Sequence, residues 1–201
     1  MSRIYTTLRA RYCRGMHMGQ GVEWALHGCL NLAFAPPSQP VPAALLAELL
    51  DAPPAYLVKQ LQALAKAGVL HSTSGPRGGF SLARPPRDIT YLDVVTAIEG
   101  PGQAFRCTEL RQRGPLRTPP KQCVTPCAIA TTMWRAERAW RDELKSHTIH
   151  DLQQHLTGLG VDLPVRLGKW LEEQRGDATQ TPRAPGTKRG GGDAARTRHR
   201  G

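Results

Sequence analysis

Residues 54–70, PAYLVKQLQALAKAGVL, decide how this sequence folds. Three leucines recur at the spacing of one helix face: Leu57, Leu61 and Leu64. Pro54 stands where a helix start tolerates a missing N–H, and Gly68 can supply a left-handed cap at the other end. The pattern therefore predicts a helix over Pro54–Ala67 with a buried leucine stripe.

The flanking segments extend this helix into a larger motif. A shorter helix is expected at Pro42–Leu50, and residues 51–54, DAPP, form the turn between the two. Downstream, Val69–Ser72 and Phe80–Ala83 are half-apolar and flank a glycine-rich turn, which is the pattern of a β-hairpin. A helix, a turn, a second helix and a hairpin follow the order of a winged helix-turn-helix, whose second helix enters the major groove.

The second helix and the hairpin tip supply the candidate DNA contacts. The helix residues that lie off the leucine stripe are Ala55, Tyr56, Val58, Lys59 and Gln62. Lys59 suits a phosphate or a guanine edge, Gln62 an adenine edge, and Tyr56 a phosphate. At the tip we expect contacts from Ser74, Gly75, Arg77 and Gly78. The competing interpretation is an ordinary helical hairpin facing solvent, followed by a tight turn.

Apolar periodicity places further helices on both sides of this motif, at about Gly19–Ala35, Tyr91–Glu99, Ala128–His147, Ile149–Leu156 and Gly160–Glu173. The expected fold class is mainly α with a small β-hairpin wing, plus a long dimerisation helix. The expected organisation is an N-terminal extension (1–15), a DNA-binding domain (16–101), a cysteine-bearing loop (102–127), a dimerisation region (128–173) and a disordered basic tail (174–201).

The net charge of +11 is concentrated at the two ends. Residues 1–15 carry +4 and residues 174–201 carry +5, which leaves +2 for the rest. Such tails attract nucleic acid regardless of its sequence, so a non-specific nucleic-acid-binding protein is an alternative function. No apolar run is long enough for a membrane span and no export signal is visible, so a cytoplasmic protein is expected. No motif of the common enzyme classes is present in the sequence, so no enzyme is expected.

Four stretches, residues 21–26, 56–70, 72–86 and 89–100, resemble in order the Rrf2 family of bacterial winged-helix repressors. This family includes regulators of iron–sulfur-cluster assembly and sensors of nitric oxide. The resemblance implies a homodimer, paired through the long helix, on a roughly palindromic operator in double-stranded DNA. The family often carries Arg at the position of Ser74, and Arg77 is the candidate substitute here.

Three cysteines between the fourth helix and the long helix form a candidate sensor: Cys107, Cys123 and Cys127. Three thiolates with one further ligand can hold an iron–sulfur cluster, and the resemblance implies such a site in this region. Glu23 matches an acidic fourth ligand of a nitric-oxide sensor, although a solvent-facing or ion-paired Glu23 is the simpler interpretation. Zinc, a reversible disulfide or no role at all remain open. Cys29 lies on an apolar helix face and is expected in the core.

The segment Ala128–His147 carries a heptad-like apolar spacing at Met133, Trp140 and Leu144. This stripe can pair with a second copy of the chain, with Trp140 as an anchor. The alternative is that it packs on the chain's own domain.

Overall fold

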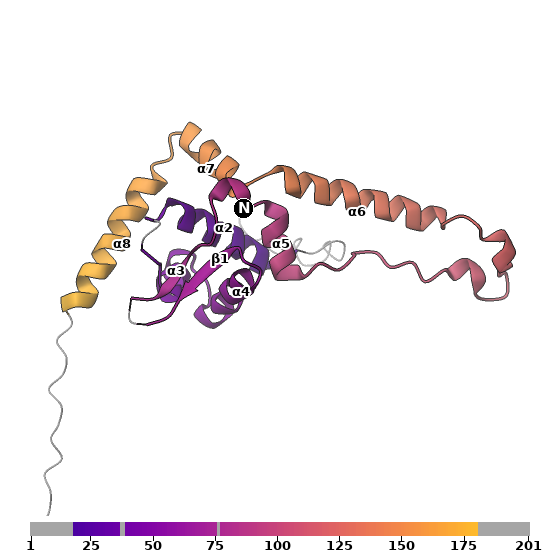
Figure 1. Cartoon of the computed structure of the whole chain (residues 1–201), viewed down its shortest axis with the longest axis horizontal. Helices are drawn as coiled ribbons and strands as arrows, with labels where there is room; N and C mark the ends of the chain where they lie inside the picture. Colours follow the sequence, from indigo (N-terminus) through magenta and orange to yellow (C-terminus); the bar gives the residue numbers. More distant parts are fainter. Residues whose placement is uncertain (1–17, 37–38, 76, 181–201) are drawn as a thin grey trace, which may run out of the picture.

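The computed structural model describes residues 18–36, 39–75 and 77–180. Residues 18–100 form a winged-helix domain, from which an arm of residues 102–146 projects (Figure 1). The domain contains helices α2 (Gln20–Phe34), α3 (Ala43–Leu49), α4 (Pro54–Lys66) and α5 (Tyr91–Glu99), with strands β1 (Leu70–Thr73) and β2 (Gly79–Leu82). The expected fold class is confirmed: the chain is mostly helical with one antiparallel hairpin.

Helix α4 forms as the sequence predicts. Its leucine stripe is fully buried, and its first residue, Pro54, occupies the start of the helix. The helix ends where Gly68 takes the left-handed backbone conformation (φ 72°), and the Val69 N–H then bonds the carbonyl of Leu64. The turn from α3 into α4 passes through Asp51, which also has a positive φ of 45° that aspartate tolerates better than most residues.

The hairpin pairs β1 with β2 in antiparallel register, with Ser72 opposite Phe80. The sequence did not reveal a further bridge: Val41, just before α3, exchanges two backbone hydrogen bonds with Phe80, at 2.8 and 2.9 Å. This bridge ties the wing to the entry of the helix-turn-helix. The orientation of the wing relative to α4 is therefore fixed by backbone hydrogen bonds.

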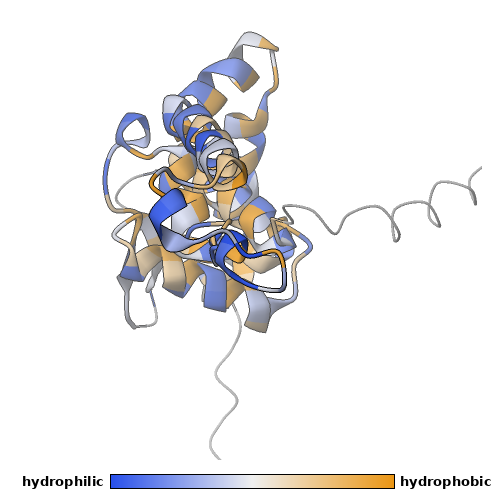
Figure 2. Ribbon diagram, turned by 90° about the vertical axis from the view of Figure 1, so that its right-hand side faces the viewer, coloured by the Kyte–Doolittle hydropathy of each residue, from blue (hydrophilic) through white to orange (hydrophobic). Residues whose placement is uncertain are grey.

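The core lies between α2, α4, α5 and the hairpin. Cys29, Leu46, Leu57, Leu61 and Val94 are buried within it. In Figure 2, hydrophobic residues gather between the helices of the domain. The first helix buries its predicted apolar face, so the domain forms its own hydrophobic core from one chain.

Three helices follow the domain. Helix α6 (Ala128–Ser146) forms the returning half of the arm, and α7 (Ile149–Gly158) packs back against α2. Two short 3-10 turns, η2 (Leu110–Gln112) and η3 (Pro120–Gln122), lie in the cysteine loop, residues 102–127. No helix of the described part of the chain is long and apolar enough to cross a lipid bilayer.

The last helix differs from the expectation. A short helix was expected at Gly160–Glu173, followed by disorder from residue 174, but α8 runs over Leu163–Gln180. The first half of α8 is held in place because Leu167 and Leu171 are buried in the core. Residues 174–180 can then extend a helix that is already formed, which costs less than starting a new one. The predicted N-terminal extension and residues 181–201 lie outside the described residues.

Candidate DNA-binding surface and cysteine loop

The outer face of α4 is open to solvent. Ala55, Tyr56, Lys59 and Gln62 are exposed, and Val58 is half-buried. All five lie away from the buried leucines, so the structure places the predicted helix contacts on one surface. None of the four exposed side chains belongs to the core of the domain, which leaves them free to meet base edges and phosphates.

Gln60 was not predicted and has a different role. Its side chain is 6% exposed, although it lies on the same helix as the exposed set. A Cβ built on Gly21 of α2 would lie 3.1 Å from the Gln60 side chain, so this glycine lets the amide pack closely against α2. The amphipathic pattern of α4 gave no signal for Gln60, because glutamine normally counts as an exposed residue.

Tyr56 is oriented by a ring contact. Its ring meets Trp24 of α2 edge to face, with centroids 5.3 Å apart. Tyr56 remains 48% exposed. An edge-to-face pair limits the rotation of the ring while the rest of the side chain stays in solvent, so Tyr56 is pre-positioned at the start of α4.

Two of the wing glycines are required by close backbone contacts within the protein. A Cβ on Gly78 would lie 2.2 Å from the Thr73 carbonyl oxygen, and one on Gly79 would lie 2.4 Å from that of Val41. Gly75 differs, because nothing lies within 4 Å of its Cβ position and its φ of 102° accounts for the glycine. Gly78, one of the predicted DNA contacts, and its neighbour Gly79 are therefore already required by close backbone contacts within the protein.

The polar residues of the wing tip face solvent. Ser74 and Arg77 are exposed, and the Gly78 N–H closes the tip by bonding the Gly75 carbonyl at 2.8 Å. The tip therefore presents one hydroxyl and one guanidinium beyond a closed turn. Pro76, between them, lies outside the described residues.

The root of the arm is held to the domain by backbone pairing. Thr90 and Thr148 form an isolated antiparallel bridge, and each begins a helix with a capping box. In α5, Thr90 accepts from the Asp93 N–H, and in α7 Thr148 accepts from the Asp151 N–H. The Thr148 hydroxyl and the Thr148 backbone N–H both donate to the Asp151 carboxylate, which holds the pKa of Asp151 below its usual value. The Thr90–Thr148 bridge thus fixes the direction in which α6, and with it the arm, projects from the domain.

The segment that leads from α5 into the arm, at residues 102–104, is hydrogen-bonded to α6. Arg141 pairs with Glu137 at 3.1 Å and donates to the carbonyl oxygen of Gly102 at 2.9 Å. Glu137 in turn accepts from the Ala104 N–H at 3.2 Å. These contacts hold the start of the cysteine loop beside the middle of α6.

The rest of α6 carries exposed apolar residues. Ala130 is its one buried residue, while Ile129 is 68% exposed and Met133 is 43% exposed. Trp140 and Leu144 are half-buried. Within the winged-helix domain, α6 makes extensive contact with α5 alone. The stripe is therefore partly covered by the chain's own domain, at Trp140 and Leu144, and exposed at Met133.

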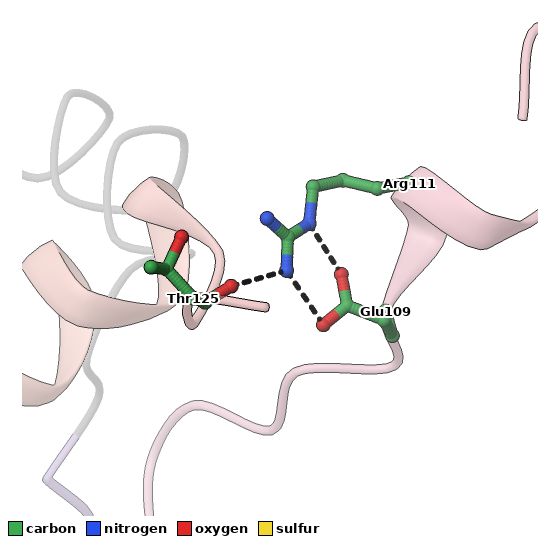
Figure 3. A network of polar contacts seen from close by, with 3 residues as sticks. All are labelled: Glu109, Arg111 and Thr125. Carbon is green, nitrogen blue, oxygen red and sulfur yellow. Dashed lines mark hydrogen bonds and ion pairs between the residues drawn. The ribbon is translucent and has the colours of Figure 1, made fainter. Parts of the chain in front are cut away.

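A polar network organises the tip of the arm (Figure 3). Glu109 binds Arg111 through both carboxylate oxygens, at 2.5 and 3.0 Å, and Arg111 also donates to the Thr125 carbonyl at 3.0 Å. Glu109 adopts a left-handed backbone conformation (φ 52°), which is uncommon for a residue with a Cβ. The network therefore joins the two halves of the cysteine loop.

Two of the three cysteines lie around this guanidinium. Both Cys123 and Cys127 are close enough to Arg111 to interact with it electrostatically. Cys127 is the N-cap residue of α6. Hydrogen bonds from the Ala130 and Ile129 backbone N–H groups lower the pKa of the Cys127 thiol, and the charge of Arg111 adds to the effect. Cys127 is therefore the more reactive type of cysteine.

The residues proposed to hold a cluster do not gather. No three Cys, His, Asp or Glu side chains among the described residues lie close enough together to share a metal ion. Cys107 is not among the cysteines that interact with Arg111, and Glu23 is exposed on α2, in the domain. The cysteine loop runs out along α6 to the far end of the arm, away from α2 (Figure 1). In this arrangement the donor set of one chain does not fit an iron–sulfur cluster or zinc.

The remaining cysteines differ from the loop cysteines. Cys29 is fully buried, as predicted, and burial raises the pKa of its thiol to about 12. It is a small core residue without redox reactivity. Cys13 lies outside the described residues. The sequence analysis did not single out Glu109 and Arg111. An acidic and a basic residue two positions apart in a proline-rich loop give no sequence signal for an ion pair.

Comparison with known proteins adds an independent line of evidence. Residues 18–155 match a family model described as Rrf2, iron-dependent transcriptional regulator. The chain is 28% identical over 159 residues to YwgB of Bacillus subtilis (strain 168), assigned as an HTH-type transcriptional regulator; the match covers 79% of this chain and 97% of YwgB. It is 31% identical over 156 residues to the similarly assigned Rv1287 of Mycobacterium tuberculosis (strain ATCC 25618 / H37Rv), covering 73% and 90%.

Solved structures show the same fold. A transcriptional regulator from Listeria innocua superposes with a TM-score of 0.56 at 26% identity, covering 72% of this chain and 90% of that one. CymR, the global cysteine regulator of Bacillus subtilis, superposes with a TM-score of 0.55 at 22% identity, covering 70% and 98%.

Proposed function

Because this chain belongs to the Rrf2 family of DNA-binding transcriptional regulators, which are not enzymes, we propose that it represses transcription from a specific operator as a homodimer. The single observation that carries the proposal is the division of α4. Its leucine face is buried, while Tyr56, Lys59 and Gln62 are exposed together beside the wing. A regulator of this kind acts where the DNA is, in the bacterial cytoplasm.

We expect α4 to enter the major groove. Lys59 would contact a guanine edge or a phosphate, Gln62 an adenine edge, and Tyr56 a phosphate near the start of the helix. The wing would meet the adjacent backbone or minor groove through Ser74 and Arg77. Support comes from the Val41 bridge, which holds the wing in a fixed position relative to α4.

The homodimer is proposed through α6. Ile129 and Met133 are exposed apolar residues on a helix whose contact with its own domain is made mainly through α5. Trp140 and Leu144 continue the same stripe. Burial of such a stripe against a second copy removes apolar surface from water, and twofold pairing matches a palindromic operator.

We further propose that Cys123 and Cys127 form a thiol switch that responds to peroxides. The Cys127 thiolate attacks a peroxide oxygen, which yields a sulfenic acid and releases hydroxide. The Cys123 thiolate then attacks that sulfur and displaces hydroxide, which leaves a disulfide. The observation that favours this chemistry is the position of both thiols near Arg111, with Cys127 at the start of α6.

Iron–sulfur sensing is the second candidate, and it is favoured by the iron-dependent description of the family model. It would require the cysteine loop to rearrange so that Cys107 joins Cys123 and Cys127. Anaerobic purification with iron and sulfide analysis separates the two. Iron-free protein that forms the Cys123–Cys127 disulfide on peroxide treatment, read by mass spectrometry, supports the switch; stoichiometric iron and sulfide contradict it.

The DNA-binding proposal is tested by selection from a pool of random duplexes. The expected result is a palindromic sequence bound at least about a thousandfold more tightly than random duplex at physiological salt. The account fails if no sequence is enriched and all duplexes bind with equal affinity.

A further inference from the structure

A pocket lies between the end of α2 and the second strand of the wing. Its volume is about 330 Å³, which is within the range of small-molecule sites. Three segments line it: the last turn of α2 with the residues that follow, strand β2, and the turn from β2 into the short 3-10 helix η1 (Pro86–Asp88). None of the lining residues belongs to α4 or to the cysteine loop, so the pocket is separate from both surfaces described above.

The walls of this pocket are mostly apolar. Leu32 and Ala33 come from α2, Phe80 and Leu82 from β2, and Pro86 from η1. Walls of this kind bind the apolar part of a ligand by removing it from water. An inorganic ion or a free sugar would leave most of this surface uncovered, so the walls favour a ligand with an apolar body.

Arg84 is the one charged residue among the described residues that line the pocket. Its Nη2 lies 3.1 Å from the Asp93 Oδ2 atom, which also accepts from the Thr90 N–H in the capping box of α5. Within the described part of the chain, the Arg84 Nε atom is shielded from solvent and has no hydrogen-bond partner. A buried donor without an acceptor is unfavourable, so the guanidinium retains capacity for a further acceptor.

A carboxylate is the acceptor that suits Arg84 best. Guanidinium and carboxylate pair through two parallel hydrogen bonds, one of which can use Nε. The Arg84 side chain is 38% exposed, so its guanidinium is able to turn toward a ligand. The described lining residues include no second cation, and Asp93 already offsets part of the Arg84 charge. A group with a single negative charge therefore fits this position better than a phosphate with two.

The pocket shares a residue with the bridge that holds the wing. Phe80 lines the pocket and pairs with Val41 through two backbone hydrogen bonds. Gln39, two residues before Val41, lines the pocket as well. A ligand packed against Phe80 and Gln39 therefore acts on the two segments whose pairing fixes the wing relative to α4.

We propose that this pocket binds a small molecule with an apolar body and a single carboxylate, held by Arg84, and that the bound molecule changes operator affinity through the Val41–Phe80 bridge. The second part rests on the proposed operator binding by α4 and the wing. Ligand and operator are then thermodynamically linked, so each changes the affinity of the other by the same factor.

Isothermal titration calorimetry of the full chain tests the ligand class with three probes: benzoate, 2-naphthoate and octanoate. At least one should bind with a dissociation constant below about 1 mM. Its neutral amide should bind at least about tenfold more weakly, because it cannot form the charge-assisted pair with Arg84. Acetate, which lacks the apolar body, should bind at least about tenfold more weakly as well. The inference is overturned if all three probes fail to bind, or if the amide or acetate binds as tightly as the probe.

Two substitutions locate the bound probe. Arg84→Met keeps an apolar stem without the guanidinium and should weaken carboxylate binding at least about tenfold, while the weaker affinity for the amide stays the same. Ala83→Leu narrows the pocket from an exposed position and should weaken both ligands. Unchanged carboxylate affinity in either folded variant contradicts the assignment. Should Arg84→Met fail to fold, Ala83→Leu decides.

Arg87→Met is the matched control. Arg87 is exposed on η1 and does not line the pocket, so this variant should bind the probe like the full chain. A loss in Arg87→Met equal to that in Arg84→Met would assign the binding to the general attraction of anions by a basic chain, and would overturn the inference.

Fluorescence anisotropy of the selected operator tests the coupling to the wing. A saturating concentration of the bound probe should change operator affinity at least about fivefold in the full chain and leave it unchanged in Arg84→Met. Unchanged operator affinity in the saturated full chain would contradict the coupling. Failure to select any operator would instead refute the proposed function, because calorimetry measures the probe without DNA.

Discussion

The winged-helix domain and the arm handle their apolar residues in opposite ways. In the domain, Leu57, Leu61 and Leu64 of α4 are completely buried by the same chain. In the arm, Ile129 and Met133 of α6 are largely exposed, and the outgoing segment is held to α6 by polar contacts instead. The difference indicates that the domain can fold as a monomer, whereas the apolar face of the arm is left uncovered by the described chain at Ile129 and Met133.

The largest expected effect concerns the core of the domain. Leu61→Ala removes a fully buried side chain and should lower the free energy of unfolding by about 2 to 5 kcal/mol. Ile129→Ala on the arm should change domain stability by much less. Urea unfolding of both variants measures the contrast. Equal losses would show that the arm is part of the same core.

The next effect concerns dimerisation. Met133→Asp places a charge in the exposed apolar stripe of α6 and should raise the dimer dissociation constant at least about tenfold. Thr131→Asp is the matched control, because Thr131 is exposed on the opposite face of the same helix. Sedimentation velocity over a range of concentrations gives both constants. If the two substitutions act alike, the stripe is not the interface.

A smaller effect is expected from a single methyl group in the wing. Gly79→Ala should force the hairpin away from Val41, at a cost of roughly 1 to 3 kcal/mol, and weaken binding to the selected operator. Gly102→Ala on the arm meets nothing within 4 Å and should be neutral. Thermal unfolding and fluorescence anisotropy report the two properties. Unchanged operator affinity in Gly79→Ala would show that the wing position is not set by this contact.

The smallest effect concerns the thiol of Cys127. Its lowered pKa means that the thiolate persists to lower pH than in a free cysteine, whose pKa is about 8.5. Alkylation by iodoacetamide should therefore reach half its maximal rate at lower pH in the native protein than in urea. Arg111→Gln should move this midpoint upward, because the lost positive charge favoured the thiolate.

The same pKa shift gives a stability prediction with a definite sign. A depressed pKa in the folded state stabilises the protein above the pKa of the unfolded thiol, and the contribution is lost as pH falls through the folded value. A midpoint for Cys127 that is identical in native and unfolded protein would remove the proposed activation of this thiol.

The sequence predicted the domain well because its signals are local. The leucine spacing of α4, the proline at its start and Gly68 at its end act within a few residues, and the structure follows them. The alternation on either side of the glycine-rich turn likewise predicted the hairpin, to within one residue at each end. Such patterns determine local structure before tertiary contacts contribute.

Contacts between distant residues could not be predicted. The Val41–Phe80 bridge joins residues 39 positions apart, and the burial of Gln60 depends on Gly21 of another helix. The Glu109–Arg111–Thr125 network depends on how the cysteine loop folds back on itself, which no periodicity encodes. Helix α8 was underestimated because its composition beyond residue 173 is polar, whereas its stability comes from Leu167 and Leu171 earlier in the helix.

The most direct test of the account is operator preference in the double variant Lys59→Ala, Gln62→Ala. Both side chains are exposed on α4, so the fold should be unaffected. Gln154→Ala, an exposed residue of α7, is the control. In anisotropy competition against random duplex, we predict that the double variant loses at least about tenfold of its preference for the selected operator, while the control keeps it. An unchanged preference in the double variant would contradict DNA reading by α4.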